Sequence, residues 1–187
     1  MKTIENGVNL QMNTIVVRRA EFEDITNINQ IEKRAGNAFS SMPMDFLCSL
    51  PQEIPLHSYG FYEKKIRSNE LFVAEIENKV VGFICISNIN EESAIHVSEF
   101  AVDYTYQKRR IGFQLINVVI ELAKKKHKSI TLTTFSNVPW NAPFYEKLGF
   151  VTIDKSQLNE RLVLLLAQES EMGLPKEYRC AMRLWVS

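Results

Sequence analysis

The segment Ile111–Lys126 constrains the fold more than any other part of this sequence. It is long and apolar on most sides, so we expect a helix that packs between layers of the fold. Its basic end, with Lys124, Lys125 and Lys126, suits the negative end of the helix macrodipole. A helix buried in this way needs a sheet to cover it, which favours a layered α/β architecture.

Strand and helix patterns alternate on either side of this helix. Short β-branched or alternating runs predict strands over 14–18, 71–76, 80–87, 94–102, 129–135, 150–153 and 178–186. Helical spacing predicts further helices over 25–35, 56–67, 139–148 and 158–172. The simplest fold for strands and helices in this order is a central, twisted, mixed β-sheet of about seven strands flanked by helices on both faces.

Composition removes several classes of protein. The chain has 187 residues, ordinary globular composition, and 22 basic against 22 acidic side chains. We expect a flexible arm over 1–12 and a single domain over 13–187. Zero net charge argues against a nucleic-acid partner. The longest apolar runs are too short to span a membrane. Three scattered cysteines predict a reduced, cytoplasmic protein, and three scattered histidines predict no metal site.

The segment from Glu99 to Gly112 carries the strongest chemical signal. A strand leads into a turn, and Lys108, Arg109 and Arg110 then stand at a helix start, where cations are unfavourable unless an anion binds. The alternative is a solvated basic turn. If strict alternation holds, Glu99 shares a face with Ile95, Val97 and Ala101, and partial desolvation would raise its pKa as a general base requires. The alternative is a structural carboxylate paired with an arginine.

A third stretch runs from Asn141 to Phe150, with Tyr145 late in a short helix that ends at Gly149. Tyr145 is either half-buried core or a general acid. Together these stretches resemble the GNAT superfamily of acyl-CoA-dependent N-acyltransferases, as does the element order from about residue 14 to 186. Residues 107–112 match the family's cofactor motif, with Arg110 in place of its first glycine. The Phe-Tyr-Glu-Lys-Leu-Gly-Phe segment at 144–150 is a close and rather specific match.

The resemblance implies acetyl-CoA as co-substrate and no metal. Its pantetheine arm would pair with the strand backbone, and its pyrophosphate would bind the amides that follow. An asparagine near Val138 would add a further contact. The cofactor residues implied in this way are Phe100, Ala101, Val102, Gln107, Lys108, Arg109, Arg110, Ile111, Gly112, Phe113, and Asn137 or Asn141.

The implied reaction is direct attack of a primary amine on the thioester within a ternary complex. Glu99 would be the general base and Tyr145 the general acid. A non-catalytic acetyl-CoA-binding regulatory module is the alternative. The acceptor cannot be read from the sequence, although six aromatic residues are candidates for its pocket wall: Phe39, Phe46, Tyr59, Phe61, Tyr62 and Trp140. The 157–172 helix is expected to pack on the sheet, with an acceptor cover or a homodimer contact as alternatives.

Overall fold

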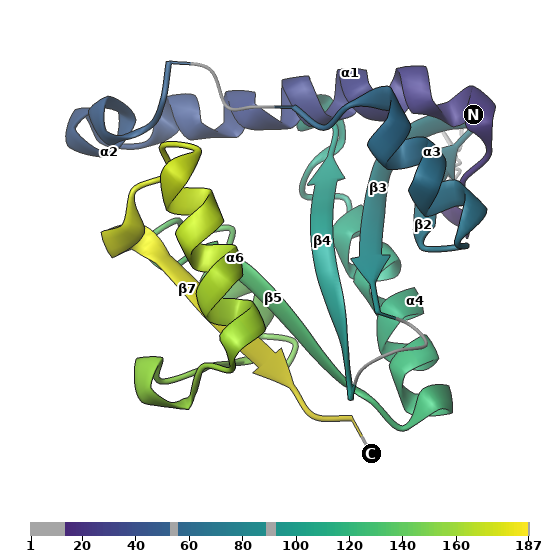
Figure 1. The fold of residues 1–187 in the computed structure, drawn as a ribbon. Helices are drawn as coiled ribbons and strands as arrows, with labels where there is room; N and C mark the ends of the chain where they lie inside the picture. Colours follow the sequence, from purple (N-terminus) through teal and green to yellow (C-terminus); the bar gives the residue numbers. More distant parts are fainter. Residues whose placement is uncertain (1–13, 53–55, 89–92, 187) are drawn as a thin grey trace, which may run out of the picture.

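The computed structural model describes residues 14–52, 56–88 and 93–186, and these residues form one seven-stranded sheet in the order β1-β2-β3-β4-β5-β7-β6 (Figure 1). Neighbouring strands are antiparallel except β4 and β5, which are parallel. The strands are β1 (Val16–Arg19), β2 (Leu71–Ile76), β3 (Lys79–Ser87), β4 (Ala94–Val102), β5 (Ser129–Phe135), β6 (Val151–Thr152) and β7 (Arg179–Leu184). The prediction of a mixed sheet of about seven strands is confirmed.

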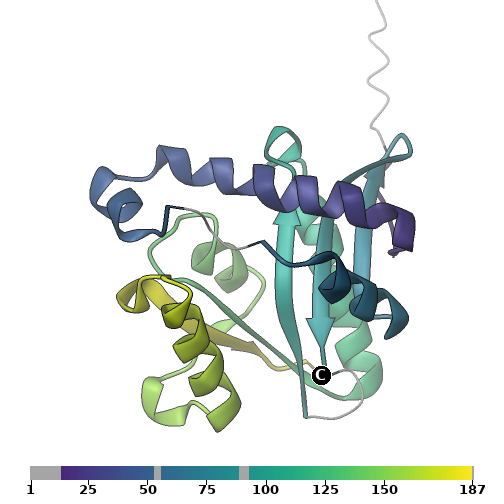
Figure 2. The ribbon, with the colours of Figure 1, turned by 45° about the horizontal axis from the view of Figure 1, so that its top comes forward.

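Helices cover both faces of this sheet (Figures 1 and 2). They are α1 (Ile25–Ala35), α2 (Met44–Ser49), α3 (Tyr59–Arg67), α4 (Ile111–Lys126), α5 (Ala142–Glu146) and α6 (Glu160–Glu171). Side chains of α4 and α5 share one apolar cluster with the sheet, and those of α1 and α3 share another. The apolar residues of α6 pack with Ile153 and Ala181, on the side of the sheet opposite α4.

Helix α4 has the predicted bounds but does not lie between two layers. Leu115, Ile116 and Val119 are fully buried against the sheet, whereas Phe113 on the outer side is 39% exposed. Half-buried apolar residues flank the buried ones, and they explain why the sequence of this helix is apolar on most sides. The expectation of a sandwiched helix is therefore wrong. Gly82 of β3 allows the close approach, because a Cβ atom there would lie 3.2 Å from the Leu115 Cδ1 atom.

The start of α1 is fixed by an arginine on β1. Arg18 donates to the Asp24 carboxylate at 2.7 Å and to the Glu75 carboxylate of β2 at 2.5 Å. The Asp24 carboxylate also accepts from the Glu21 backbone N–H, which completes a capping box before the helix. This junction sets the direction in which α1 crosses the sheet.

Some predicted bounds differ from the structure. The helix predicted over 139–148 is only α5, because residues 138–141 form a turn with the Asn141 N–H bonded to the Val138 carbonyl. The strand predicted over 150–153 shortens to β6. The predicted arm at 1–12 lies outside the described residues, and the single domain over 13–187 stays a prediction. No described helix has both the length and the apolar character required to cross a membrane.

We predict that Leu115→Ala lowers the free energy of unfolding by about 2–5 kcal/mol, because it leaves a cavity where α4 meets β3. Leu164→Ala is the matched control, since Leu164 of α6 is exposed, and it should change stability by less than about 0.5 kcal/mol. Urea titration of both variants measures the difference. Equal losses would show that α4 is not part of the core.

Candidate active site

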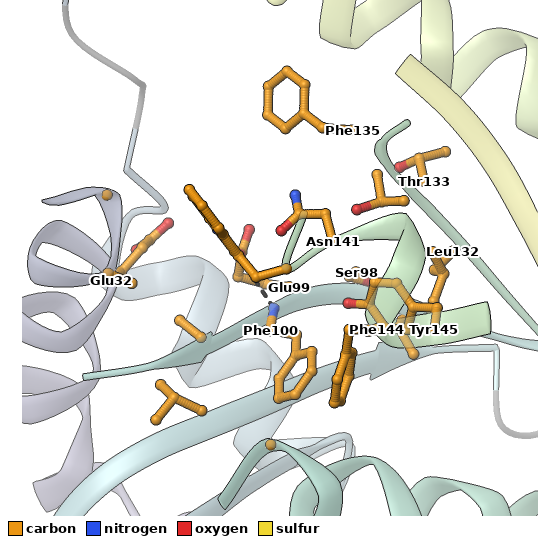
Figure 3. Close-up of a pocket in the computed structure, with 18 of the residues that line it drawn as sticks. Glu32, Ser98, Glu99, Phe100, Leu132, Thr133, Phe135, Asn141, Phe144 and Tyr145 are labelled. Atoms are coloured by element: carbon orange, nitrogen blue, oxygen red, sulfur yellow. Dashed lines mark hydrogen bonds between the residues drawn. The ribbon is translucent and has the colours of Figure 1, made fainter. Parts of the chain in front are cut away.

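The candidate site is a groove of about 2200 Å³ that opens where β4 and β5 separate. The two strands pair from Ala94 to Val97 and from Ser129 to Leu132, and then diverge, as Figure 1 shows. The groove is lined by residues of α1, β4, the start of α4, α5 and α6. Figure 3 shows side chains from several of these elements directed into the same space.

A β-bulge in β4 decides which way Glu99 points. Cys85 of β3 lies opposite Glu99 but the next residue, Ile86, lies opposite Val97, so Ser98 is the extra residue. Glu99 and Ala101 therefore face the side of α1 and α3, whereas Ile95 and Val97 face α4. The prediction that these four residues share a face is wrong, because the bulge interrupts the alternation.

The Glu99 carboxylate lies in a partly desolvated, acidic environment. Its side chain is 29% exposed, and its Oε1 atom accepts a hydrogen bond from the Phe100 N–H at 3.1 Å (Figure 3). Burial raises the pKa of Glu99, and the nearby Glu32 carboxylate raises it further, while His57 acts in the opposite direction. The direction of this pKa shift agrees with the expectation, although the acidic neighbour was not foreseen.

Sequence reasoning missed two groups beside Glu99, namely Glu32 of α1 and His57 just before α3. The His57 Nδ1 atom lies 2.9 Å from Glu32 Oε1 and 3.8 Å from Glu99 Oε2. Glu32 also accepts a hydrogen bond from the Tyr62 hydroxyl at 2.8 Å. One signal was available: Glu32 follows the buried Ile28 by one helical turn, so α1 directs a carboxylate toward the sheet.

The spacing of Glu32, His57 and Glu99 would suit a metal ion, but hydrogen bonds within the chain already occupy one of the three residues. Ligand-type atoms of Glu32, His57 and Glu99 lie within 4.8 Å of each other, a spacing that a metal ion could bridge. Both Glu32 oxygens, however, already accept hydrogen bonds from Tyr62 or from the His57 ring and backbone. Glu32 is thus committed to groups of this chain.

Tyr145 reaches the groove from the opposite side of the sheet. It lies on α5, is buried, and packs against the rings of Phe100, Phe144 and Phe150. Burial raises the pKa of its phenol, and the charge of Glu99 raises it further. The hydroxyl therefore stays protonated at neutral pH, as a proton donor requires.

The loop that leads into α4 lines the groove and contains two residues in the left-handed conformation. Lys108 and Arg110 both take left-handed backbone conformations, with φ of 62° and 65°. Glycine adopts this conformation without strain, which explains why the family motif has glycine where Arg110 stands. Gly112 lines the groove beside Phe100, and a Cβ atom there would lie 3.2 Å from the Phe100 ring.

The other predicted cofactor residues divide into two groups. Phe100, Ala101, Val102, Gln107, Lys108, Arg110, Ile111, Gly112, Phe113 and Asn141 line the groove. Arg109 does not, and its guanidinium lies over the Tyr106 ring. Asn137 is exposed outside the groove, whereas Asn141 begins α5 and is directed into it (Figure 3).

The opposite wall of the groove belongs to α6 and β7. Glu169 of α6 forms a paired hydrogen bond with Arg179 at 2.8 and 2.9 Å, and it accepts from the Thr133 hydroxyl. Helix α6 therefore lines the groove as well as packing on the sheet. Of the six candidate aromatic residues, Phe39, Phe61 and Trp140 line the groove, Phe46 and Tyr62 are core, and Tyr59 is exposed.

Comparison with known proteins identifies the family. The model of the acetyltransferase (GNAT) family matches residues 39–150, more than half of the chain. The chain belongs to the GNAT acetyltransferase family. An uncharacterised N-acetyltransferase of Methanocaldococcus jannaschii is 38% identical over 85 residues, which are 42% of this chain and 38% of that protein. The matched part thus spans well under half of the length of that relative.

Solved structures share the fold. Ard1 from Thermoplasma volcanium superimposes with a TM-score of 0.63 at 17% identity, over 92% of this chain and 98% of its own. The PaiA N-acetyltransferase from Thermoplasma acidophilum, solved in complex with coenzyme A, gives a TM-score of 0.64 at 16% identity, over 91% of this chain and 98% of its own. Both similarities confirm the GNAT-like fold.

We predict that Gly112→Glu weakens acetyl-CoA binding at least tenfold, equivalent to about 1.4 kcal/mol. The new side chain adds bulk and negative charge beside Phe100 in the groove. Gly60→Glu is the control, because Gly60 of α3 is exposed and a Cβ atom there would meet nothing within 4 Å. Calorimetric titration of both variants measures the affinity. Unchanged affinity in Gly112→Glu would place the phosphates elsewhere.

Proposed function

We propose that this protein is an acetyl-CoA-dependent N-acetyltransferase that transfers the acetyl group directly to a primary amine in a ternary complex. One observation carries the proposal. A carboxylate, Glu99, and a phenol, Tyr145, enter one groove from opposite faces of the sheet, where β4 and β5 have separated. A base and an acid on either side of a reacting thioester are what this transfer requires.

The cofactor half of the groove follows from an edge of β4 that no other strand covers after Val97. From Ser98 to Val102, β4 has β3 on one edge and the groove on the other, so its groove edge is open to an extended ligand. The pantetheine arm would form hydrogen bonds along this edge at Phe100 and Val102, in place of the side-chain hydrogen bonds that Glu99 and Gln107 make with these backbone groups. The pyrophosphate would then reach the free N–H groups over residues 108–113, where the helix dipole favours an anion.

The chemistry follows from the two side chains. A protonated amine has no lone pair, so Glu99 would accept its proton, directly or through one water. The amine nitrogen would then attack the thioester carbonyl, and the tetrahedral oxyanion would need N–H donors. When the C–S bond breaks, Tyr145 would donate its proton to the thiolate of CoA. The attacking nitrogen loses a second proton as the amide forms, and this proton would restore the Tyr145 phenolate to a phenol, directly or through water. Protons and electron pairs then balance without a metal ion.

A second reading is a regulatory module that binds acetyl-CoA without turnover. A titratable carboxylate and a phenol in one groove favour an enzyme. Release of free CoA thiol in the presence of an acceptor library distinguishes the two.

The free cysteines Cys48, Cys85 and Cys180 fit a reducing, cytoplasmic setting.

We predict that millimolar acetyl-CoA raises the melting temperature, because a ligand that binds only the folded state stabilises it by mass action. The increase should persist when a chelator is present. Differential scanning fluorimetry with and without the chelator measures it. An unchanged melting temperature at saturating acetyl-CoA would count decisively against the proposal.

We predict different pH responses for the two proposed catalytic groups. Glu99→Gln should lose most activity between the raised pKa of Glu99 and the pKa of the amine, since the base works only where Glu99 is ionised and the amine still carries its proton. The loss should shrink as pH approaches the amine pKa.

Tyr145→Phe should instead lose activity at every pH in this range, by about 100-fold, because the raised pKa keeps the phenol protonated throughout. Acetyl-CoA affinity should stay within about threefold in both variants. Steady-state rates between pH 6 and 10 measure the two profiles. Parallel losses at all pH values, or no loss in either variant, would refute the assigned roles.

A further inference from the structure

Three distant segments bring Glu32, His57 and Glu99 together on one side of the groove. Glu32 comes from α1, His57 from the turn before α3, and Glu99 from β4. The His57 Nδ1 atom lies between the two carboxylates, 2.9 Å from one and 3.8 Å from the other. Figure 3 shows Glu32 on α1 directed toward the strand that carries Glu99.

Glu32 holds the histidine rather than facing a ligand. Its side chain is only 9% exposed, and its oxygens accept from the His57 N–H, the His57 ring and the Tyr62 hydroxyl. The His57 ring also packs on Phe61, with 4.1 Å between ring centroids. The ring is therefore fixed from two directions, while 32% of its side chain stays exposed toward the groove.

Two carboxylates this close repel each other unless a cation lies between them. The other nearby cations have other partners. The Lys65 ammonium of α3 donates to the Glu70 carboxylate, the Ser87 hydroxyl and the Ile86 carbonyl. Across the groove, the Arg179 guanidinium of β7 is engaged by Glu169 of α6.

Three further titratable groups near Glu99, in the part of the chain that the structure describes, are neutral. Burial raises the pKa of the Cys85 thiol to about 12, and it also raises the pKa of the Tyr62 and Tyr145 phenols. Among the described residues, His57 is therefore well placed to supply a positive charge beside both Glu32 and Glu99.

We propose that His57 is a positioning residue: held by Glu32, it presents an imidazolium to Glu99 and keeps that carboxylate ionised and available as the base. The inference rests on the proposed function, in which Glu99 accepts the proton of the amine. It adds the group that sets the lower pH limit of that reaction.

The electrostatics of the cluster support this assignment. Burial disfavours the charged imidazole, yet the hydrogen bond that its ring donates to Glu32 and the charges of Glu99 and Glu32 raise the pKa of His57 overall. His96 provides the contrast. It is buried, its Nδ1 atom lies 3.0 Å from the Thr131 hydroxyl oxygen, and burial lowers its pKa to about 3.

The test is the pKa of Glu99 itself, followed by NMR through its carboxyl carbon resonance and assigned by the loss of that signal in Glu99→Gln. In His57→Gln we expect this pKa to rise by about one unit, because Glu99 loses its cation and still faces Glu32. In Glu32→Gln we expect a smaller change, because the repulsion is lost together with the carboxylate that holds His57 and keeps it charged. In the double variant, which lacks both charges, we expect it to return close to that of the unmodified protein.

A histidine with only a structural role would not raise the pKa of Glu99 when replaced alone and let that pKa return when Glu32 is replaced as well. His127→Asn is the control, since His127 is exposed at the end of α4 and asparagine tolerates its left-handed conformation. An unchanged Glu99 pKa in His57→Gln overturns the inference. So does a double variant whose pKa stays as high as that of His57→Gln. Binding of acetyl-CoA by each variant confirms that it is folded.

Rates distinguish failure of this inference from failure of the proposed function. The acid limb of kcat/KM should move upward by about one pH unit in His57→Gln. If Glu99→Gln keeps full activity, the proposed function fails, and the NMR shifts still decide the role of His57. If Glu99→Gln is inactive and the acid limb of His57→Gln does not move, the function stands and the inference is wrong.

Discussion

The separation of β4 from β5 after Val97 and Leu132 is the constraint on which the rest of the site depends. Each strand stays anchored on its outer edge, β4 by β3 and β5 by β7, so the two can diverge without losing the sheet. Their inner edges then carry backbone groups that need partners other than each other. An extended ligand that bonds to this edge of β4 would replace the missing strand, which is why a cofactor with an amide-containing arm suits this position.

The bulge at Ser98 determines which face of the sheet carries the Glu99 carboxylate at this opening. If side chains alternated strictly from Ile95 to Glu99, Glu99 would lie on the face of α4, among the aromatic side chains that surround Tyr145. With the bulge, the carboxylate lies among charged groups, while the phenol stays in an apolar environment. On the proposed mechanism, the two faces of one sheet thus bring the proton acceptor and the proton donor to a single groove.

The sequence was a good guide to the elements and a partial guide to the site. The bounds of β4, β5 and α4 agree with prediction because each period is regular and ends at a clear turn. The bulge could not be predicted, since no glycine or proline marks Ser98 and a single extra residue leaves the apolar pattern looking continuous. Glu32 and His57 were missed because they meet Glu99 only through the crossing of α1 over the sheet. Motif matching likewise proposed Asn137 and Asn141 equally, and only the turn before α5 brings Asn141 to the groove.

The groove also shows why the net charge of the chain says little about its ligands. The 22 basic and 22 acidic side chains cancel overall, yet cations gather at the start of α4 and carboxylates gather between α1 and β4. An anionic cofactor and a cationic amine would therefore meet opposite local charges at the two ends of one groove. On the proposed mechanism this arrangement also favours turnover. The ammonium is attracted to Glu99, but the amide formed from it is neutral and no longer benefits from that charge. The acidic end thus binds the amine more strongly than its product, so the reaction itself weakens the attraction that brought the substrate in.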